Sequence, residues 1–272
     1  MKTEVKKMLE ITNLQKTFNP GTVNAKTALR GLNLTLDDGD FVTVIGGNGA
    51  GKSTLLNAIS GVWKPDYGRI ELDGVDITGM PEHKRAKFLG RVFQDPMKGT
   101  APDMEIAENL AIASKRGLKR RLRWGVKISD RRQYRELLSS LELGLEDRLS
   151  TKVGLLSGGQ RQAITLLMAT LNRPKLLLLD EHTAALDPKT AAKVLELTDK
   201  IVSENNLTTL MITHNMHDAI KYGNRLIMMH EGNVVVDIRG EEKQKLTIEQ
   251  LLQLFESSSG SKFTSDKVIL SK

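Results

Sequence analysis

A glycine-rich loop at residues 46–53 constrains the fold of this chain more than any other feature of the sequence. It reads Gly-Gly-Asn-Gly-Ala-Gly-Lys-Ser, with an apolar run at residues 41–45 before it and a helical pattern at residues 53–59 after it. Strand, glycine loop and helix in this order are typical of a phosphate loop, in which small residues let backbone N–H groups close around phosphate oxygens. A glycine turn without a ligand is the alternative. We expect the ligand contacts to come from Gly46, Asn48, Gly49, Ala50, Gly51, Lys52, Ser53 and Thr54.

Lys52 and Ser53, at the end of this loop, carry its charge and its metal-ligating oxygen. In a phosphate loop the lysine neutralises the β and γ phosphates of a nucleotide, and the serine hydroxyl ligates Mg²⁺. Because the chain has no cysteine, a disulfide framework and a thiolate metal site are both excluded. With only five histidines as well, we expect a metal to enter only together with a nucleotide.

A run of four leucines at residues 176–179 is followed directly by Asp180 and Glu181. A buried strand that ends in two carboxylates places them at the edge where ligands of doubly wound sheets bind. We expect Asp180 to hold Mg²⁺ through water, and Glu181 to polarise an attacking water. Two solvated acids at the end of a strand are an equally common alternative.

The pentapeptide Leu-Ser-Gly-Gly-Gln at residues 156–160 lies between the glycine loop and the paired acids. No phosphate-loop enzyme needs this sequence for its own nucleotide. We therefore expect it to be the piece that one subunit presents to the nucleotide held by another.

Hydrophobic periodicity predicts an α/β organisation with an inserted helical segment. Short apolar runs predict strands near the start of the chain, and helical periodicity replaces them between residues 96 and 156. Further along, apolar strands alternate with helices, which predicts a parallel sheet covered on both faces. Strands are expected at residues 9–14, 32–36, 41–45, 176–179, 208–212, 225–229 and 234–238. Helices are expected at residues 53–59, 104–113, 134–143, 190–204, 217–222 and 247–255.

The net charge of +7 is concentrated in one segment of the chain. Residues 115–135 contain ten basic side chains and one acid, Asp130, so that the rest of the chain is close to neutral. A local basic patch suggests an anionic neighbour, either nucleic acid or a lipid surface. A solvated helical face is the alternative.

The start of the chain and its apolar stretches exclude two kinds of membrane segment. Residues 1–10 carry three lysines, but no apolar segment of the length of a secretory signal follows. The longest wholly apolar stretches are far shorter than the ~20 residues needed to cross a bilayer. We therefore expect a soluble chain that is not exported.

Together these motifs resemble the nucleotide-binding subunit of an ABC transporter, and the resemblance covers residues 9–238. It implies a P-loop (RecA-like) parallel-sheet core, an N-terminal antiparallel β subdomain and an inserted α-helical subdomain. The implied ATPase domain is residues 1–240, with the core at 1–95 and 157–240, the helical subdomain at 96–156, and a C-terminal helix and mobile tail at 241–272.

The resemblance implies roles for three residues near the nucleotide. Phe18 stands where an aromatic, more often tyrosine, stacks on adenine, and a core phenylalanine is the alternative. Gln94 matches the loop glutamine that touches Mg²⁺ and the attacking water and joins the core to the helical subdomain. His214 matches the switch histidine that contacts the γ-phosphate and orients Glu181.

Two further matches concern the partner subunit. The turn formed by Ser157, Gly158, Gly159 and Gln160 resembles the helix-capping turn that donates hydrogen bonds to the γ-phosphate bound by the partner. Asp187 resembles the aspartate of a loop that crosses the dimer interface. One departure is visible, because His182 occupies the position after the paired acids, where the family usually has proline. It either perturbs Glu181 or is tolerated, and we favour tolerance.

The resemblance implies an ATPase that dimerises around two ATP and Mg²⁺ and drives a membrane transporter. The stretches at residues 94–109 and 180–188 look most similar to importers of the amino-acid type, although lipid and lipoprotein exporters share the arrangement. The expected partners are a second copy, transmembrane permease subunits and, indirectly, an extracytoplasmic solute-binding protein, at the cytoplasmic face of the membrane. A nucleic-acid ATPase is the other class. It is disfavoured because the chain has no long heptad pattern, no zinc module and only 4% aromatic residues.

Overall fold

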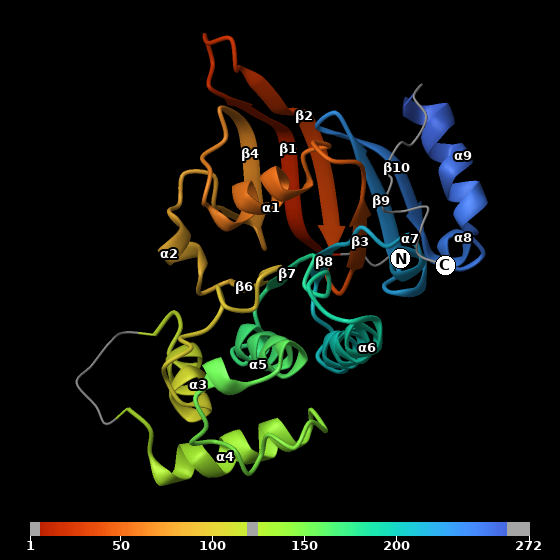
Figure 1. Ribbon diagram of the computed structural model, residues 1–272. Coiled ribbons are helices and arrows are strands. Elements are labelled where there is room, and N and C mark those ends of the chain that lie inside the picture. Colours follow the sequence, from red (N-terminus) through yellow and green to blue (C-terminus); the bar gives the residue numbers. More distant parts are fainter. Residues whose placement is uncertain (1–5, 119–124, 260–272) are drawn as a thin grey trace, which may run out of the picture. The chain divides into compact units, whose positions relative to one another are not determined.

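The computed structural model describes residues 6–118 and 125–259 and divides the chain into two compact units. Unit 1 comprises Met1–Arg85 and Asn206–Lys272, and unit 2 comprises Ala86–Asn205 (Figure 1). Within the described ranges, no helix combines the length and the apolar character that spanning a membrane requires.

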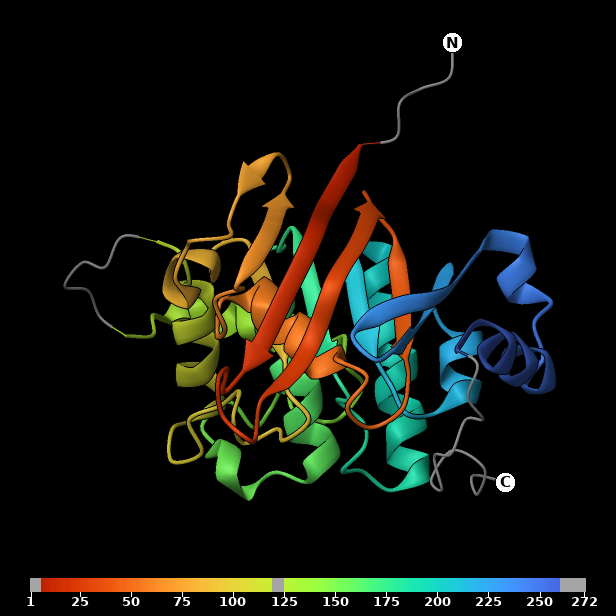
Figure 2. The ribbon, with the colours of Figure 1, turned by 90° about the horizontal axis from the view of Figure 1, so that it is seen from above.

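Unit 1 begins with an antiparallel sheet in the order β2-β1-β4-β5. β1 pairs with β2 on one side and with β4 on the other, and Figure 2 shows β1 and β2 as two long neighbouring strands. The strands expected at residues 9–14 and 32–36 are therefore confirmed, whereas β4 and β5 were not predicted. The sheet consists of β1 (Lys7–Phe18), β2 (Lys26–Asp37), β4 (Tyr67–Leu72) and β5 (Val75–Asp76).

The side chains of β1 follow the period of a strand that buries one face. Leu9 and Ile11 are buried, as alternation requires, but the next buried side chain is Leu14. Between Ile11 and Leu14 the pairing with β2 shifts register, and Asn13 has a positive φ of 49°. This β-bulge moves the buried face by one residue, so that Leu14 rejoins the core.

The glycine loop follows β3 (Phe41–Ile45), one of four neighbouring strands in unit 1. β3 is buried throughout and pairs in parallel with β8 (Thr209–Ile212) and β9 (Arg225–His230). The strand expected at residues 234–238 is present as β10 (Asn233–Arg239), but it runs antiparallel to β9. No helix separates β9 from β10. Glu231 and Gly232 both have positive φ, 45° and 82°, which is the backbone of a tight hairpin turn.

Helices complete unit 1. α1 (Lys52–Ser60) follows the glycine loop, and α2 (Glu82–Arg85), α7 (Met216–Lys221) and α8 (Gly240–Gln244) are short. α9 (Ile248–Ser259) packs Leu251 and Phe255 into an apolar cluster with β10, beside which it lies in Figures 1 and 2. The helix expected at residues 247–255 is therefore confirmed and extends as far as Ser259, and residues 260–272, which hold the rest of the tail that was expected to be mobile, lie outside the described part of the chain.

Lys243 in α8 forms hydrogen bonds to the end of α7 and to the two residues that follow it. Its side chain is 1% exposed, and its Nζ donates to the carbonyl oxygens of Ile220, Tyr222 and Gly223 at 2.8, 2.6 and 2.9 Å. Burial lowers the pKa of this ammonium group to about 8. The three hydrogen bonds offset the loss of its hydration.

We expect Lys243→Met to lower the free energy of unfolding by about 3 kcal/mol, because the aliphatic chain still fits but three carbonyl groups lose their donor. Lys245→Met is the matched control, since Lys245 is 78% exposed and forms a surface ion pair with Glu241, one turn earlier. Urea denaturation compares the two variants. An equal loss of stability in both would contradict this role of Lys243.

Unit 2 combines two strands with helices. β6 (Leu89–Val92) and β7 (Leu176–Asp180) pair in parallel, with Val92 opposite Leu179. The helices are α3 (Ile106–Ser114), α4 (Ile128–Ser139), α5 (Gly158–Thr170) and α6 (Pro188–Glu204), with a 3₁₀ turn at Val153–Leu155. Their apolar sides form one core cluster that includes Ile106, Leu110, Tyr134, Leu138, Leu145, Val153 and Ile164.

The helix predicted at residues 134–143 is displaced toward the basic run. α4 starts at Ile128, where the Lys127 N–H donates to Asp130 Oδ2 at 3.0 Å, and it ends at Ser139. Beyond it the chain turns, with Glu142 at a positive φ of 54°. Because the first residues of α4 are mostly polar, the pattern of apolar residues in the sequence does not show where this helix begins.

Three arginines in the described part of the basic run form ion pairs, and residues 119–124 of the run lie outside the described ranges. Arg131 is 3.0 Å from Glu105, and Arg132 is 3.6 Å from Glu136. Arg135 lies 3.8 Å from Asp147. These ion pairs offset part of the local positive charge.

Candidate functional site

Glycine is required in the phosphate loop at two positions where the backbone has a positive φ. Gly46 has a φ of 153°, and a Cβ there would lie 2.3 Å from the Met229 carbonyl oxygen. Gly51 has a φ of 101°, and its Cβ would lie 2.6 Å from the Ala28 carbonyl oxygen. Gly51 is also the N-cap of α1 and supplies no side chain to cap it. The loop therefore leads into a helix N-terminus that suits an anion.

Lys52 folds back over the phosphate loop. Its Nζ donates to the carbonyl oxygens of Gly46 and Gly47 at 2.7 and 3.2 Å, and the residue is 6% exposed. The ammonium group therefore lies within the loop, where it can meet phosphate oxygens. Ser53 is exposed and Thr54 half-buried on the first turn of α1, and the Ala50 N–H closes the loop by donating to the Gly47 carbonyl at 3.2 Å.

His214 lies at the same sheet edge as the phosphate loop. Val44 of β3 is opposite Ile212 of β8, and the Thr213 N–H donates to the Val44 carbonyl at 3.1 Å. His214 is the next residue, and it is half-buried. Because β3 and β8 are parallel, His214 and Gly46 both leave the carboxyl ends of neighbouring strands, the edge where α/β sheets bind ligands.

Phe18 ends β1 and packs against a second aromatic residue that the sequence analysis missed. Its ring is 5.2 Å from the Trp63 ring at an interplanar angle of 82°, an edge-to-face contact. Phe18 is half-buried and Trp63 is 41% exposed. Lys16 Nζ lies 5.7 Å from the Phe18 ring centroid. Stacking of Phe18 on adenine stays a prediction.

The structure of unit 2 brings Gln94, Asp180 and Glu181 to one edge of the β6–β7 pair. Since Val92 is opposite Leu179, Gln94 and Glu181 each lie two residues beyond a paired position. Gln94 is exposed, whereas Asp180 and Glu181 are half-buried. Their predicted roles toward a metal and a water remain untested, but the three side chains start from the same edge.

Arg91 is a neighbour of Asp180 that no sequence motif pointed to. Its Nη2 lies 3.3 Å from Asp180 Oδ2, and its guanidinium carbon lies 4.6 Å from the Phe93 ring centroid. Both side chains of the pair are largely buried, at 13% and 17% exposure. The carboxylate of Asp180 is therefore held in place by a cation from the neighbouring strand.

The turn at Ser157–Gln160 begins α5 as a capping box. The Gln160 N–H donates to Ser157 Oγ at 3.3 Å, and the Ser157 N–H donates to Gln160 Oε1 at the same distance. Gly159 faces α6, because a Cβ there would lie 2.2 Å from Thr190 Cγ2. Ser157 and Gly158 remain exposed, so that the turn can meet another molecule.

Asp187 is the N-cap of α6. Its Oδ1 accepts from the Thr190 N–H at 3.1 Å. Hydrogen bonds from the Thr190 side chain and backbone lower the pKa of this exposed carboxyl, which therefore remains ionised at neutral pH. The loop that ends at Asp187 is thus fixed to the first turn of α6.

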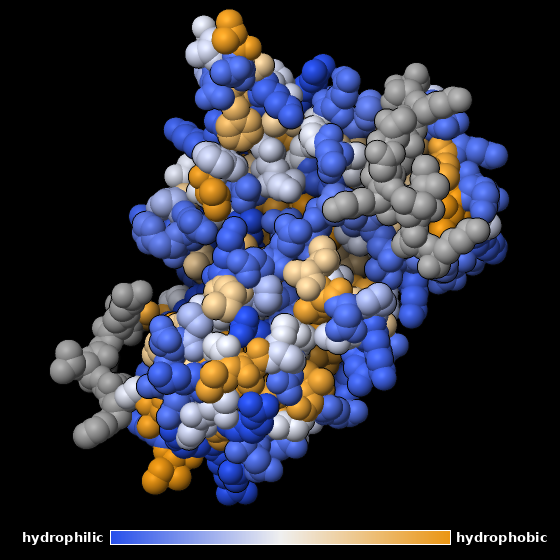
Figure 3. All heavy atoms as spheres, viewed as in Figure 1, coloured by the Kyte–Doolittle hydropathy of each residue, from blue (hydrophilic) through white to orange (hydrophobic). Residues whose placement is uncertain are grey.

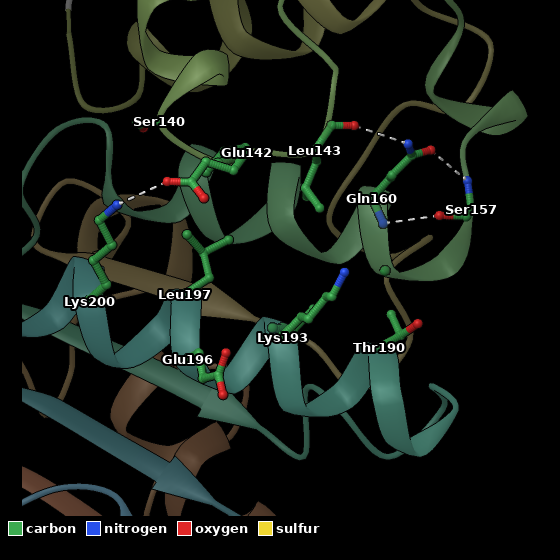
Figure 4. Close-up of a pocket in the computed structure, with 13 residues that line it drawn as sticks. Ser140, Glu142, Leu143, Ser157, Gln160, Thr190, Lys193, Glu196, Leu197 and Lys200 are labelled. Atoms are coloured by element: carbon green, nitrogen blue, oxygen red, sulfur yellow. Dashed lines mark hydrogen bonds and ion pairs between the residues drawn. The ribbon is translucent and has the colours of Figure 1, made fainter.

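A hollow of about 540 Å³ opens beside the Ser157–Gln160 turn, between the start of α5, the outer side of α6 and the chain after α4 (Figure 4). Lys193 points into it in Figure 4. At its rim Lys200 lies 3.9 Å from Glu142, and Gln160 Nε2 donates to the Leu143 carbonyl at 3.5 Å. The turn therefore has open space on one side.

Comparison with known proteins finds one matching family model and several similar proteins. Residues 29–184 match the family model described as ABC transporter. A tyrosine transport ATP-binding protein of Clostridioides difficile (strain R20291) is 50% identical over 253 residues, which cover 92% of this chain and 99% of that protein. The methionine import ATP-binding protein MetN 2 of Enterococcus faecalis (strain ATCC 700802 / V583) is 36% identical, over 84% of this chain and 64% of that protein.

Among solved structures, a similar one is the dimer of an ATP-binding cassette in a post-hydrolysis state bound to ADP and Pi. Its TM-score is 0.73 at 30% sequence identity. The alignment covers 85% of this chain and 98% of that chain.

Proposed function

This chain belongs to the ABC transporter family, as an ATP-binding and ATP-hydrolysing subunit, and we propose that two copies of it enclose two ATP and drive import of an amino acid. The observation that carries the proposal is the presence of both halves of a composite site in one chain. Unit 1 carries the phosphate loop with Lys52, and unit 2 carries the exposed turn at Ser157.

Within one subunit, four side chains divide the work on the nucleotide. Lys52 neutralises the β and γ phosphates, while the α1 N-terminus donates N–H groups to them. Glu181 accepts a hydrogen bond from the attacking water and makes it more nucleophilic. His214 contacts the γ-phosphate and orients Glu181, and Phe18 stacks on the base.

The proposed metal ligands are all oxygen atoms. Ser53 offers an exposed hydroxyl on the first turn of α1, Gln94 an exposed amide, and Asp180 a carboxylate held by Arg91. Hard oxygen ligands suit Mg²⁺, which keeps several waters of its own. When bound, the ion neutralises charge on the phosphates.

A second copy is needed to surround the γ-phosphate. Phosphoryl transfer depends on stabilising the phosphate charge from all sides, and one subunit offers its donors from one side. The exposed Ser157–Gln160 turn supplies hydrogen-bond donors at a helix N-terminus, and Asp187 starts the neighbouring helix beside it. ATP then links the two copies, and phosphate release separates them.

The proposed membrane partners are permease subunits, which would hold the chain at the cytoplasmic face of the membrane. Unit 2 exposes the apolar side chains of Met97, Ile112, Leu118, Ile128 and Leu155, with Ile128 90% exposed. Figure 3 shows apolar patches among polar atoms over the part of unit 2 that holds α4 and α5. Exposed apolar side chains of this size favour a protein partner. An extracytoplasmic solute-binding protein would take part through the permease, and nucleic acid is not expected.

An aromatic amino acid, tyrosine, is the proposed solute. The support is the 50% identity, over 99% of its length, to the tyrosine transport ATP-binding protein of Clostridioides difficile. The ATPase does not contact the solute, so the solute class follows from this likeness and not from the site.

We expect vesicles that contain this chain and its copurifying permease subunits to take up labelled tyrosine in an ATP-dependent manner. Lys52→Ala should abolish uptake, because the phosphates lose their main cationic partner. Uptake of an unrelated labelled solute, a sugar, is the control. ATP-dependent efflux of tyrosine, or uptake that is insensitive to Lys52→Ala, would contradict the proposal.

A further inference from the structure

His182 is a buried side chain directly after Glu181. It is 2% exposed, and its Nε2 lies 3.0 Å from Thr198 Oγ1 on α6. The Thr198 hydroxyl also lies 2.7 Å from the Val194 carbonyl, which can only accept a hydrogen bond. Since a hydroxyl has one proton and gives it to Val194, it must accept from His182. The imidazole is therefore a donor through Nε2–H.

Burial lowers the pKa of His182 to about 4. The ring is thus neutral at neutral pH, in agreement with a tautomer that carries its proton on Nε2. Because the ring is neutral and buried, this hydrogen bond is shielded from water and is a fixed structural contact.

The backbone next to this contact has an unusual conformation. Glu181 has a positive φ of 47°, a region that residues other than glycine, asparagine and aspartate rarely adopt. The Ala184 N–H donates to the Glu181 carbonyl at 3.0 Å and closes a turn. Such a conformation persists when the surrounding structure holds it.

The segment from Glu181 to Asp187 is attached to α6 at two points. At its end, Asp187 caps the first turn of α6 through Thr190. At its start, His182 is tied to Thr198, two turns further along the same helix. A loop that is fixed at both ends to one rigid helix has little freedom to move.

We propose that His182 is a positioning residue, which holds the backbone of Glu181 in place by donating from Nε2–H to Thr198 on α6. The inference rests on the proposed function, in which Glu181 polarises the attacking water. His182 does not touch the nucleotide or the water. It acts through the carboxylate that precedes it.

The expected effect is on turnover and not on nucleotide binding. A displacement of a catalytic group by about 1 Å lowers a rate by up to roughly 10²-fold. His182→Leu should therefore lower kcat by roughly 10- to 100-fold. The KM for ATP should stay within about twofold, because the phosphate loop and Lys52 belong to unit 1, whereas His182 and Thr198 belong to unit 2.

The experiment compares matched pairs of variants in the steady-state ATPase assay of the full chain. His182→Gln keeps an N–H donor near the Nε2 position and should restore kcat to within about threefold of the natural chain. Thr198→Val removes the acceptor without changing the volume and should match His182→Leu, whereas Thr198→Ser should be near normal. Combining His182→Leu with Thr198→Val should add little to either, since both remove the same hydrogen bond.

Three outcomes would overturn the inference: equal losses in His182→Gln and His182→Leu, a normal kcat in Thr198→Val, or a raised KM with an unchanged kcat. Should His182→Leu fail to fold, as judged by circular dichroism, the Thr198→Val and Thr198→Ser pair carries the test alone. Glu181→Gln in the same assay separates the two hypotheses. Normal turnover there removes the proposed role of Glu181, whereas an inactive Glu181→Gln beside normal His182 and Thr198 variants removes only the role of His182.

Discussion

Glu181→Gln should bind ATP normally and hydrolyse it about 10²–10⁴-fold more slowly than the natural chain. The amide has the shape of the carboxylate but is a far weaker base, so that the attacking water loses its partner. ATP binding should persist, because the phosphate loop and Lys52 lie in unit 1 and are unchanged. Phosphate release measures turnover, and a fluorescent ATP analogue measures binding.

Glu204→Gln is the control for this prediction. Glu204 is the exposed last residue of α6, in the same unit as Glu181, and its replacement removes the same charge. We expect its turnover to be normal. A Glu181→Gln chain with turnover within threefold of the natural one would remove Glu181 from the mechanism.

Ser157→Arg should lower the rate of ATP hydrolysis by about 100-fold or more. ATP binding to the single subunit should remain intact. The variant loses the side-chain cap of α5, which costs about 1 kcal/mol and is tolerable for a folded unit. Its main effect is expected to be steric, because a long side chain then occupies the exposed turn, which in the proposed dimer faces the partner's γ-phosphate. Ser139→Arg, at the exposed end of α4, is the matched control and should remain active.

Mixing two inactive variants gives the sharper form of this test. Ser157→Arg has an intact phosphate loop, and Lys52→Ala has an intact Ser157 turn. A mixed dimer contains one composite site that is built from the two intact halves, so that mixing should restore part of the activity. Restoration is the signature of a turn that acts on the partner's nucleotide. Loss of ATP binding in Ser157→Arg, or a mixture as inactive as its components, would contradict a role in the partner's site.

The local part of the fold and of the site could be predicted from the sequence because short-range patterns specify it. Gly46 and Gly51 must be glycine for the loop to pass the Met229 and Ala28 carbonyls, so the motif and its conformation are inseparable. Likewise, Ser157 and Gln160 are three residues apart, as their capping box requires. The fold class that these motifs imply agrees with the solved ATP-binding cassettes.

Other features depend on contacts that a sequence pattern does not show. Arg91 reaches Asp180 across a strand pair, and Trp63 meets Phe18 across 45 positions of sequence, so neither has a local signal. The direction of β10 was wrong in the prediction because an apolar run does not show whether the preceding connection is a hairpin or a crossover. The boundaries at residues 95, 156 and 240, and the nucleotide and metal contacts of the site, stay predictions.

The proposal that two copies share each ATP is tested most directly by the mass of the Glu181→Gln chain in solution. Light scattering on a sizing column should give the 30.1 kDa of a single chain without nucleotide, and twice that value with saturating ATP and Mg²⁺. A mass of 30.1 kDa at every protein concentration with ATP, beside a natural chain whose specific ATPase activity does not change on dilution, would contradict the account.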